Sequence, residues 1–269
     1  MVAVIIIWGI LIRLIFINSH TFWYDEAIAI SIARTPIAEI FTVSASYNWT
    51  PLFALLLKPI LFVTQDHLVF RLFSLILGSL SLWLTYRVIS FWSKPIALMT
   101  TYFMTLSPLQ VYFAVEVREY TLIVLEALTL TYFYKMYSLD RKRLYLFGYM
   151  VVGILTLYTH FYAALLILTF GVLGFRKDRL GRSWLLVNLC ILGIFSPWLY
   201  AIKDISRPPC WCMGPVTGAL ATIAGFSVNG MGRVPFYDIL YNAGRIMSVW
   251  HRIVSVYFGI LFILWLNLA

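Results

Sequence analysis

Charged residues are scarce in this chain: they make up 12% of its 269 residues, while apolar residues make up 62%. A soluble globular domain carries roughly 25% charged and about 45–50% apolar residues. A water-soluble core of this length could not bury so much apolar surface, so the composition excludes an ordinary soluble domain. It predicts an integral membrane protein, in which lipid covers the excess apolar surface.

Cysteine is also rare, with three in the chain. Cys210 and Cys212 are too close for an ordinary disulfide, and without a nearby histidine they are a poor zinc signal. The sequence contains neither GxGxxG nor GxxxxGKS/T, so no nucleotide-binding loop is predicted. The formal charge of +9 lies largely in short links between apolar runs, so no nucleic-acid partner is expected.

The sequence contains nine long apolar runs. They lie at 1–17, 51–64, 69–91, 96–114, 120–137, 144–158, 161–175, 184–201 and 252–268. A membrane-spanning helix needs about 20 apolar residues, within a range of about 17–25. Several runs are slightly short, and flanking aromatic residues are expected to extend them into the interface. We expect an all-α protein with about eight transmembrane helices.

Basic residues predict the orientation of these helices. Half of the 20 lysines and arginines lie in three links, at 87–94, 135–143 and 176–182, and such an excess marks cytoplasmic links. The connections at 115–119, 159–160 and 202–251 are then extracytoplasmic. Together with segment 18–68, they carry eight of the 11 acidic residues. We expect a multi-pass protein of the cell membrane with a cytoplasmic N-terminus.

Segment 18–68 is expected to lie wholly on the extracytoplasmic side. Run 1–17 leads outward and run 69–91 must return inward, so run 51–64 cannot cross and instead suits an interfacial helix. Thr50-Pro51 and Thr35-Pro36 each favour a helix start, with threonine at the N-cap and proline at the first helical position. The sequence therefore predicts juxtamembrane helices in this segment.

The acidic pair Asp25-Glu26, after the aromatic stretch at 22–24, is the strongest candidate for chemistry. Both carboxylates could simply open the next helix and complement its dipole. Adjacent residues on a helix point about 100° apart, so the pair would not share a proton. One could face a substrate while the other fixes the loop. The residues alone leave both interpretations open.

Two further clusters fall at outer boundaries, EVREY at 116–120 and YTHFY at 158–162. Ionisable residues at a membrane boundary are often functional, and the planar fork of Arg118 suits phosphate oxygens. Both clusters could also be interfacial anchors, with Arg118 snorkelling and aromatic rings in the belt. The candidates for substrate contact in these clusters are Glu116, Glu119, Tyr120, His160 and Tyr162.

The three clusters together resemble the GT-C glycosyltransferases that use a polyprenyl-phosphate-linked sugar, a group that includes protein O-mannosyltransferases and lipid A aminoarabinose transferases. The resemblance covers roughly residues 8–175, and the acidic pair is its most specific element. Its features, in order, are Arg13, Trp23-Tyr24-Asp25-Glu26-Ala27, Thr50-Pro51-Leu52, Arg71-Leu72-Phe73-Ser74, Gly78, Ser107-Pro108, Glu116-Val117-Arg118-Glu119-Tyr120 and Tyr158-Thr159-His160-Phe161-Tyr162.

The resemblance implies transfer of a sugar from a polyprenyl-phosphate donor to a hydroxyl of a lipid, glycan or protein acceptor. It implies that Asp25, grouped with Glu26 as catalytic, is the general base, and that Arg118 holds the lipid phosphate. Such a reaction needs a base on the acceptor and a cation at the departing phosphate. Lys58 and Arg13 are the candidates to support Arg118. A divalent metal held by Glu26, Glu119 or His160 stays open.

Two departures leave the subfamily, and so the acceptor, undetermined, and the sequence does not identify the sugar. Trp49-Thr50-Pro51-Leu52 stands where protein O-mannosyltransferases carry a His-Pro-Pro-Leu-type sequence. The aminoarabinose enzymes place an aspartate shortly after the basic residue of the second loop, where this chain has Glu119.

The resemblance also divides the chain. Residues 1–201 are expected to form a seven-span catalytic module that includes outer segment 18–68. Residues 202–251 form a further outer loop, and 252–269 an eighth transmembrane helix. Because the chain ends inside an apolar run, it is expected to be part of a longer protein.

Two other classes stay open. A multi-span transporter or channel could line its pathway with Glu126 and the outer charges. Against it, Glu126 is the main ionisable residue near a span centre, and no paired, broken helices recur in two halves. A non-catalytic membrane scaffold subunit is the other alternative.

Overall fold

The computed structural model describes residues 1–202, apart from residues 20, 21, 23, 48 and 177–179. The described residues belong to a single unit, Met1–Ile205, and form 11 helices and no strand, which confirms the all-α prediction for them. The expected loop at 202–251, apart from Ile202 at its start, and the expected helix at 252–268 lie outside the described residues, as do His20 and Trp23.

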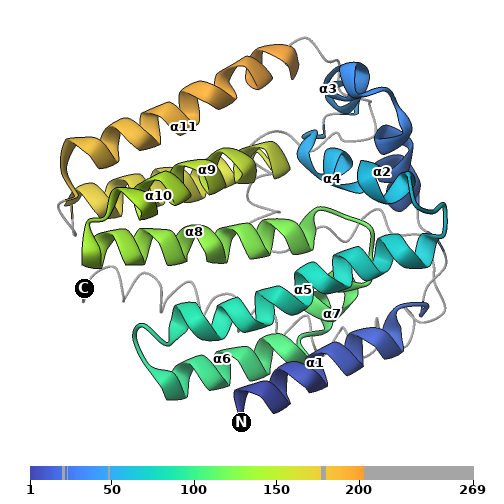
Figure 1. Ribbon diagram of the computed structural model, residues 1–269, viewed down its shortest axis with the longest axis horizontal. Helices are drawn as coiled ribbons and strands as arrows, with labels where there is room; N and C mark the ends of the chain where they lie inside the picture. Colours follow the sequence, from blue (N-terminus) through green and yellow to red (C-terminus); the bar gives the residue numbers. More distant parts are fainter. Residues whose placement is uncertain (20–21, 23, 48, 177–179, 203–269) are drawn as a thin grey trace, which may run out of the picture. The chain divides into compact units, whose positions relative to one another are not determined.

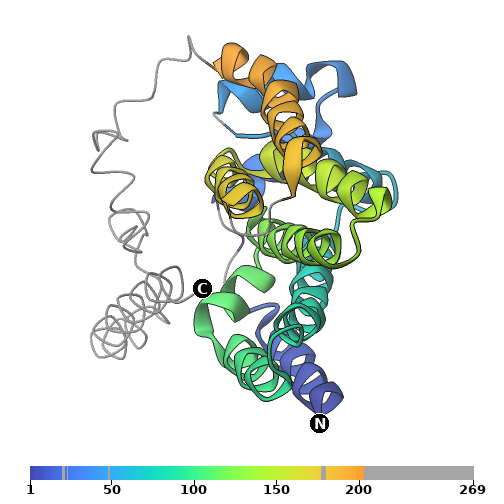
Figure 2. The ribbon, with the colours of Figure 1, turned by 90° about the vertical axis from the view of Figure 1, so that its left-hand side faces the viewer.

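Long helices form on most of the predicted spans (Figure 1). They are α1 (Val2–Phe16), α5 (His67–Ile89), α8 (Tyr120–Asp140), α9 (Arg143–Thr159), α10 (Ala163–Arg176) and α11 (Gly181–Ile202). Helix α5 packs against α1 and α8, α8 packs against α9, and α11 packs against α9 and α10. In Figure 2 these helices are seen nearly end-on, with α1 and α11 at opposite ends of the row.

The apolar run 96–114 is not a single helix. It divides into α6 (Lys94–Leu106) and α7 (Pro108–Ala114). Ser107, between them, has the extended conformation that a following proline favours, with φ −61° and ψ 117°. The expectation of one continuous helix over this run is therefore wrong, because the helix is interrupted at Ser107.

By length and composition alone, two of the described helices could cross a membrane, α5 and α11. Helices α1, α9 and α10 are apolar but shorter, with 15, 17 and 14 residues. Helix α8 has 21 residues, but it carries Glu126, Lys135 and Asp140. The count of about eight spans therefore stays a prediction.

Segment 18–68 contains the short helices α2 (Tyr24–Arg34), α3 (Ile37–Ser46) and α4 (Leu52–Leu61). The predicted helix at 51–64 is confirmed as a short one, with ten residues. The predicted caps are wrong: Pro36 and Pro51 occupy the N-cap positions, and no side chain caps either helix. The threonine hydroxyls instead donate to carbonyl groups, Thr35 to Ile32 and Thr50 to Thr159.

Apolar side chains hold α2 and α4 against the start of α5. Ala29, Ile32 and Ala33 recur at helical spacing on one face of α2 and are buried. They belong to one cluster with Leu57 of α4 and Phe70 of α5. This packing fixes the first turn of α2, which carries Asp25 and Glu26.

The connections predicted to be extracytoplasmic meet at one end of this helical unit. Arg71, at the start of α5, donates to the carbonyl of Ile17, just after α1. Val117 donates its N–H to Glu26, and Thr50 bonds to Thr159 at the end of α9. The grouping of 18–68, 115–119 and 159–160 agrees with the parity argument, and their side of a membrane stays a prediction.

Two of the basic links meet as well. The Lys135 ammonium lies 5.3 Å from the centre of the Trp92 ring, which joins the link after α5 to the end of α8. The helices that start at the acidic connections therefore end near these basic ones.

Candidate functional site

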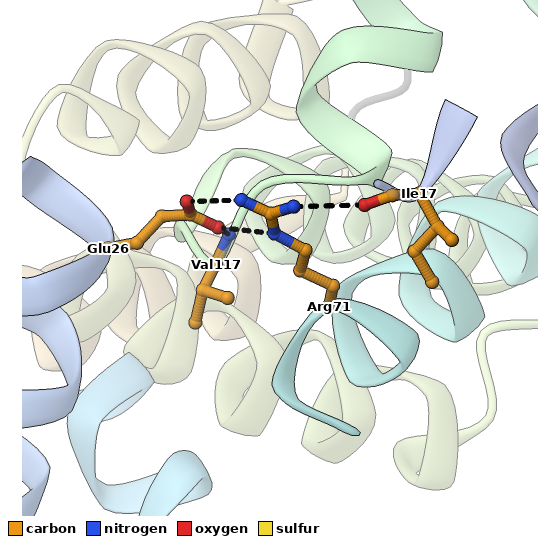
Figure 3. Close-up of polar contacts among 4 residues, drawn as sticks. All are labelled: Ile17, Glu26, Arg71 and Val117. Carbon is orange, nitrogen blue, oxygen red and sulfur yellow. Dashed lines mark hydrogen bonds and ion pairs between the residues drawn. The ribbon is translucent and has the colours of Figure 1, made fainter. Parts of the chain in front are cut away.

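Glu26 is the centre of a buried set of polar contacts (Figure 3). Its Oε1 accepts hydrogen bonds from Arg71 Nε and from the backbone N–H of Val117, both at 3.0 Å. Its Oε2 accepts one from Arg71 Nη2 at 2.8 Å. Arg71 Nη1 also donates to the Ile17 carbonyl at 3.0 Å. One carboxylate thus ties α2 to α5 and to segment 115–119.

These contacts decide the role of Glu26. The guanidinium of Arg71 binds both of its oxygens in the bidentate geometry that makes such pairs strong. The side chains of Glu26 and Arg71 are both buried, with relative exposures of 0% and 5%. A fully buried, fully bonded carboxylate has no surface for a substrate. Glu26, grouped with Asp25 as catalytic, is therefore a positioning residue, the loop-fixing role that the sequence left open.

Asp25, one residue earlier, faces a different arginine. Its Oδ2 lies 2.9 Å from Nη1 of Arg118, and its side chain is 39% exposed, whereas that of Arg118 is 8% exposed. Arg118 Nε lies 3.4 Å from Oε2 of Glu119. The structure therefore brings together the predicted base and the predicted phosphate ligand, which are far apart in sequence.

Aromatic rings surround the Arg118 guanidinium. It lies 4.3 Å from the centre of the Trp49 ring and 5.0 Å from that of Tyr120, within the range of cation–π attraction. Nη2 also donates to the Tyr120 hydroxyl at 3.0 Å. Burial lowers the pKa of Arg118, but the neighbouring carboxylates and Tyr120 outweigh burial, and its pKa is raised overall. The guanidinium is therefore a cation at neutral pH.

The hydrogen-bonding capacity of Arg118 is incompletely used. Its buried Nε and Nη1 atoms have no hydrogen-bond partner, although Glu119 and Asp25 lie within ion-pair distance. The N–H bonds are not aligned with those carboxylate oxygens, so these contacts are mainly electrostatic. An acceptor with several oxygens could satisfy both groups.

Glu116 is a buried carboxyl next to this pair. Burial raises its pKa from 4.5 to about 8; Arg118 lowers it, whereas Glu26, Asp25 and Glu119 raise it further. Glu116 is therefore mainly protonated and uncharged at neutral pH. Its backbone carbonyl accepts a hydrogen bond from the Arg118 N–H at 2.9 Å, which keeps the two residues in one tight turn.

The third predicted cluster contributes His160. Its Nδ1 accepts a hydrogen bond from the Tyr162 N–H at 3.3 Å, and its ring stacks on Phe161 and Tyr162. Burial lowers the pKa of His160, Glu119 raises it and Arg118 lowers it. Burial outweighs the effect of Glu119, so the pKa of His160 is lowered overall, and the two charged groups that act on it both belong to segment 115–119. The Tyr162 side chain is exposed.

Lys58 and Arg13 do not support Arg118 in this structure. Lys58 donates to the carbonyls of Ala33 and Thr35, where it closes the end of α2. Arg13 is buried along α1 and donates to the carbonyl of Gly9 at 2.9 Å. Both cations are engaged in holding helices, and neither contacts Arg118.

The candidate metal ligands do not form a set. Within the described part of the chain, no group of three or more histidine, cysteine, aspartate or glutamate residues could hold a metal ion. Glu26 is already bonded to Arg71 and Val117.

Three residues of this region were missed as site residues. Trp49 and Thr50 line a narrow pocket with Glu119 and residues of α2 and α4. Arg71 holds the acidic pair in place. The resemblance included Arg71 and Thr50 without assigning them roles, and Trp49 was noted only as a departure. Nothing in the sequence pairs Trp49 with an arginine 69 positions later.

A polar bridge lies beneath the pocket. Thr50 Oγ1 donates to the Thr159 carbonyl, and Thr159 Oγ1 donates to Glu126 Oε1 at 2.9 Å. Glu126, the residue on which a transporter pathway would depend, is buried and linked to the end of α9.

Comparison with known proteins gave no match: no family model, no curated protein and no solved structure matches the chain. The site is therefore interpreted from its own geometry.

Proposed function

We propose that this protein is a membrane glycosyltransferase of the GT-C type, which transfers a sugar from a polyprenyl-phosphate donor to an acceptor hydroxyl on the extracytoplasmic face. The observation that carries the proposal is the Asp25–Arg118 pair. A partly exposed carboxylate lies 2.9 Å from a buried arginine, and the two come from connections at the same end of the helical unit. These are the base and the phosphate ligand that the reaction needs.

The reaction places each group in a defined role. Asp25 accepts the proton of the acceptor hydroxyl as its oxygen bonds to the anomeric carbon of the sugar. The bond from that carbon to the phosphate oxygen breaks, and its electron pair leaves on the phosphate. Arg118 stabilises the charge on that phosphate, which afterwards takes the proton from Asp25. Atoms and charge balance without another reactant.

The surroundings of Arg118 suit a phosphate. Its planar fork matches phosphate oxygens, and two of its N–H groups lack an aligned acceptor. The centre of the Trp49 ring lies 4.3 Å from the guanidinium carbon, and the ring stabilises the cation. The uncharged carboxyl of Glu116 could donate a further hydrogen bond to an anion without repelling it.

An apolar groove gives the lipid part of the donor a place. It lies between α3, α4 and α9 and is lined by Phe41, Pro51, Leu52, Leu55, Leu155 and Tyr158. Pro51 directly follows Thr50, which lines the pocket beside Trp49 and Glu119. The groove and this pocket are therefore lined by consecutive residues of the chain, an arrangement that suits a donor with a charged head and an apolar tail.

Photocross-linking tests the donor. A photoreactive polyprenyl phosphate should label peptides from segments 18–68 and 115–119 of the purified protein, and unlabelled polyprenyl phosphate should compete. Labelling confined to other segments would contradict the proposed site. No labelling by the lipid phosphate, together with ion flux through liposomes that contain the purified protein, would favour the transporter alternative.

Cysteine accessibility tests the membrane orientation. A cysteine placed near Asp66, which caps α5, should react with impermeant reagents from the extracytoplasmic side only. Labelling from the cytoplasm alone would mean that run 51–64 crosses the membrane after all.

A further inference from the structure

Asp25 and Arg118 have separate roles in the proposed reaction, yet in this structure they form an ion pair with each other. Arg118 Nη1 lies 2.9 Å from Asp25 Oδ2. A guanidinium edge occupied by a carboxylate is closed to a phosphate, and the same contact occupies the carboxylate oxygen that would receive the acceptor proton. As the site stands, neither residue is ready for its task.

The pair is also a poor match in geometry. Arg118 Nε and Nη1 are buried, and no acceptor is aligned with their N–H bonds. The Asp25 and Glu119 oxygens approach at 2.9 and 3.4 Å without satisfying them. A phosphate group offers several oxygens around one centre and can align with an arginine fork. It is therefore a better partner for Arg118 than the carboxylate it would replace.

Of the carboxylates near Arg118, Asp25 is the one able to leave. Its side chain is 39% exposed, compared with 12% for Glu119. Glu26 is fixed by Arg71 and Val117, which keeps the start of α2 in place. A change of side-chain rotamer at Asp25 is therefore enough to separate the pair without moving the helix.

We propose that the phosphate of the lipid-linked donor displaces Asp25 from its ion pair with Arg118, so that the base becomes available only after the donor has bound. This inference rests on the proposed function and adds an order to it: the donor binds first, and the acceptor hydroxyl is activated second. In the structure the base is paired with the same arginine that, in this proposal, later holds the leaving phosphate.

Binding of farnesyl phosphate to the full chain in lipid nanodiscs tests this order by calorimetry. The double-mutant cycle comprises wild type, Asp25→Asn, Arg118→Gln and the double variant. Arg118→Gln should weaken binding at least about tenfold, because it removes charged hydrogen bonds to the phosphate. Asp25→Asn should strengthen binding about three- to tenfold, because the phosphate no longer has to displace a partly exposed ion-pair partner.

The double variant separates competition from simple repulsion between Asp25 and the phosphate. If Asp25 competes for Arg118, the gain from Asp25→Asn disappears once Arg118 is gone. If Asp25 only repels the phosphate, the gain persists without Arg118, and the proposed displacement is overturned. Monodispersity is checked for each variant, and Arg118→Met, which keeps the side-chain length, replaces Arg118→Gln if that variant does not fold.

Two further ligands separate the parts of the donor. Farnesol should bind equally to wild type and Asp25→Asn, whereas inorganic phosphate should bind more weakly than farnesyl phosphate but show the same gain. Weakening by Arg118→Gln with no gain from Asp25→Asn overturns the displacement and leaves the proposed function standing. No effect of either variant overturns both.

Discussion

Two carboxylate–arginine pairs lie side by side at the start of α2, and they differ in almost every physical respect. Glu26 and Arg71 are buried, bidentate and fully bonded. Asp25 and Arg118 are joined by a single contact, with one partner half-exposed and N–H groups left without aligned acceptors. The first pair has the features of a structural anchor. The second pair has the features of a binding site, because N–H groups of Arg118 lack aligned acceptors.

The difference shows how adjacent residues of the same charge can take different roles. Neighbouring helical residues point about 100° apart. Glu26 is therefore buried between α5 and segment 115–119, while Asp25 lies at the partly exposed edge of the same region. The buried pair fixes the start of α2 and the loop that carries Arg118. The exposed pair can then change partners on a rigid support.

The largest expected effect is on turnover. Asp25→Asn should lower sugar transfer about 10²–10⁴-fold, because the amide cannot accept the acceptor proton. Asparagine keeps the size of the side chain and suits a helix start equally well, so folding should survive. Transfer from a polyprenyl-phosphate donor by purified, monodisperse protein gives the measurement. A folded variant with near-wild-type transfer would move the base to Glu119.

The buried pair should show the opposite behaviour, a large loss of stability. Glu26→Gln leaves Arg71 buried without a counter-charge, and breaking such a pair costs about 3–5 kcal/mol in the free energy of unfolding. Asp25→Asn is the matched control: it breaks a partly exposed pair and should cost about 0.2–1 kcal/mol. Chemical denaturation of both variants in the same detergent compares them. Equal losses of unfolding free energy in the two variants would contradict the assignment of Glu26–Arg71 as the structural pair and Asp25–Arg118 as the binding site.

Arg118→Lys should have an intermediate effect. Lysine keeps the charge but loses the planar fork that suits phosphate oxygens, so the KM for the donor should rise about tenfold. Initial rates over a range of donor concentrations give this value. Unchanged KM and kcat would remove Arg118 from the donor site, whereas Arg71→Lys should act mainly on stability.

A further expected effect concerns the pH dependence of stability. Burial raises the folded-state pKa of Glu116 from 4.5 to about 8, so between these values the folded protein binds more protons than the unfolded chain. The contribution of Glu116 to stability should therefore be most favourable below about pH 4.5 and decrease as pH rises towards 8. Glu116→Gln should flatten this dependence in thermal unfolding between pH 5 and 9. A variant that keeps the wild-type slope would assign it to other groups.

Sequence patterns predicted the helices and the grouping of the connections, because apolar runs and basic links act locally. They also identified Asp25, Arg118 and His160, which the structure brings to one end. They could not decide between Asp25 and Glu26, because that choice depends on Arg71, 45 positions away. They misassigned Lys58, because its contacts with the end of α2 depend on how α2 and α4 pack.

The Glu26 anchor has a consequence for biosynthesis. Its bonds join residues 45 and 91 positions apart, and the last donor to be made is the N–H of Val117. A ribosome adds about 5–20 residues per second, so the Glu26 carboxylate waits about 5 to 20 seconds for that donor. During this interval α2 has no fixed partner in segment 115–119. A nascent chain stopped before residue 117 can therefore form α2 and α5, but it cannot yet hold Asp25 opposite Arg118.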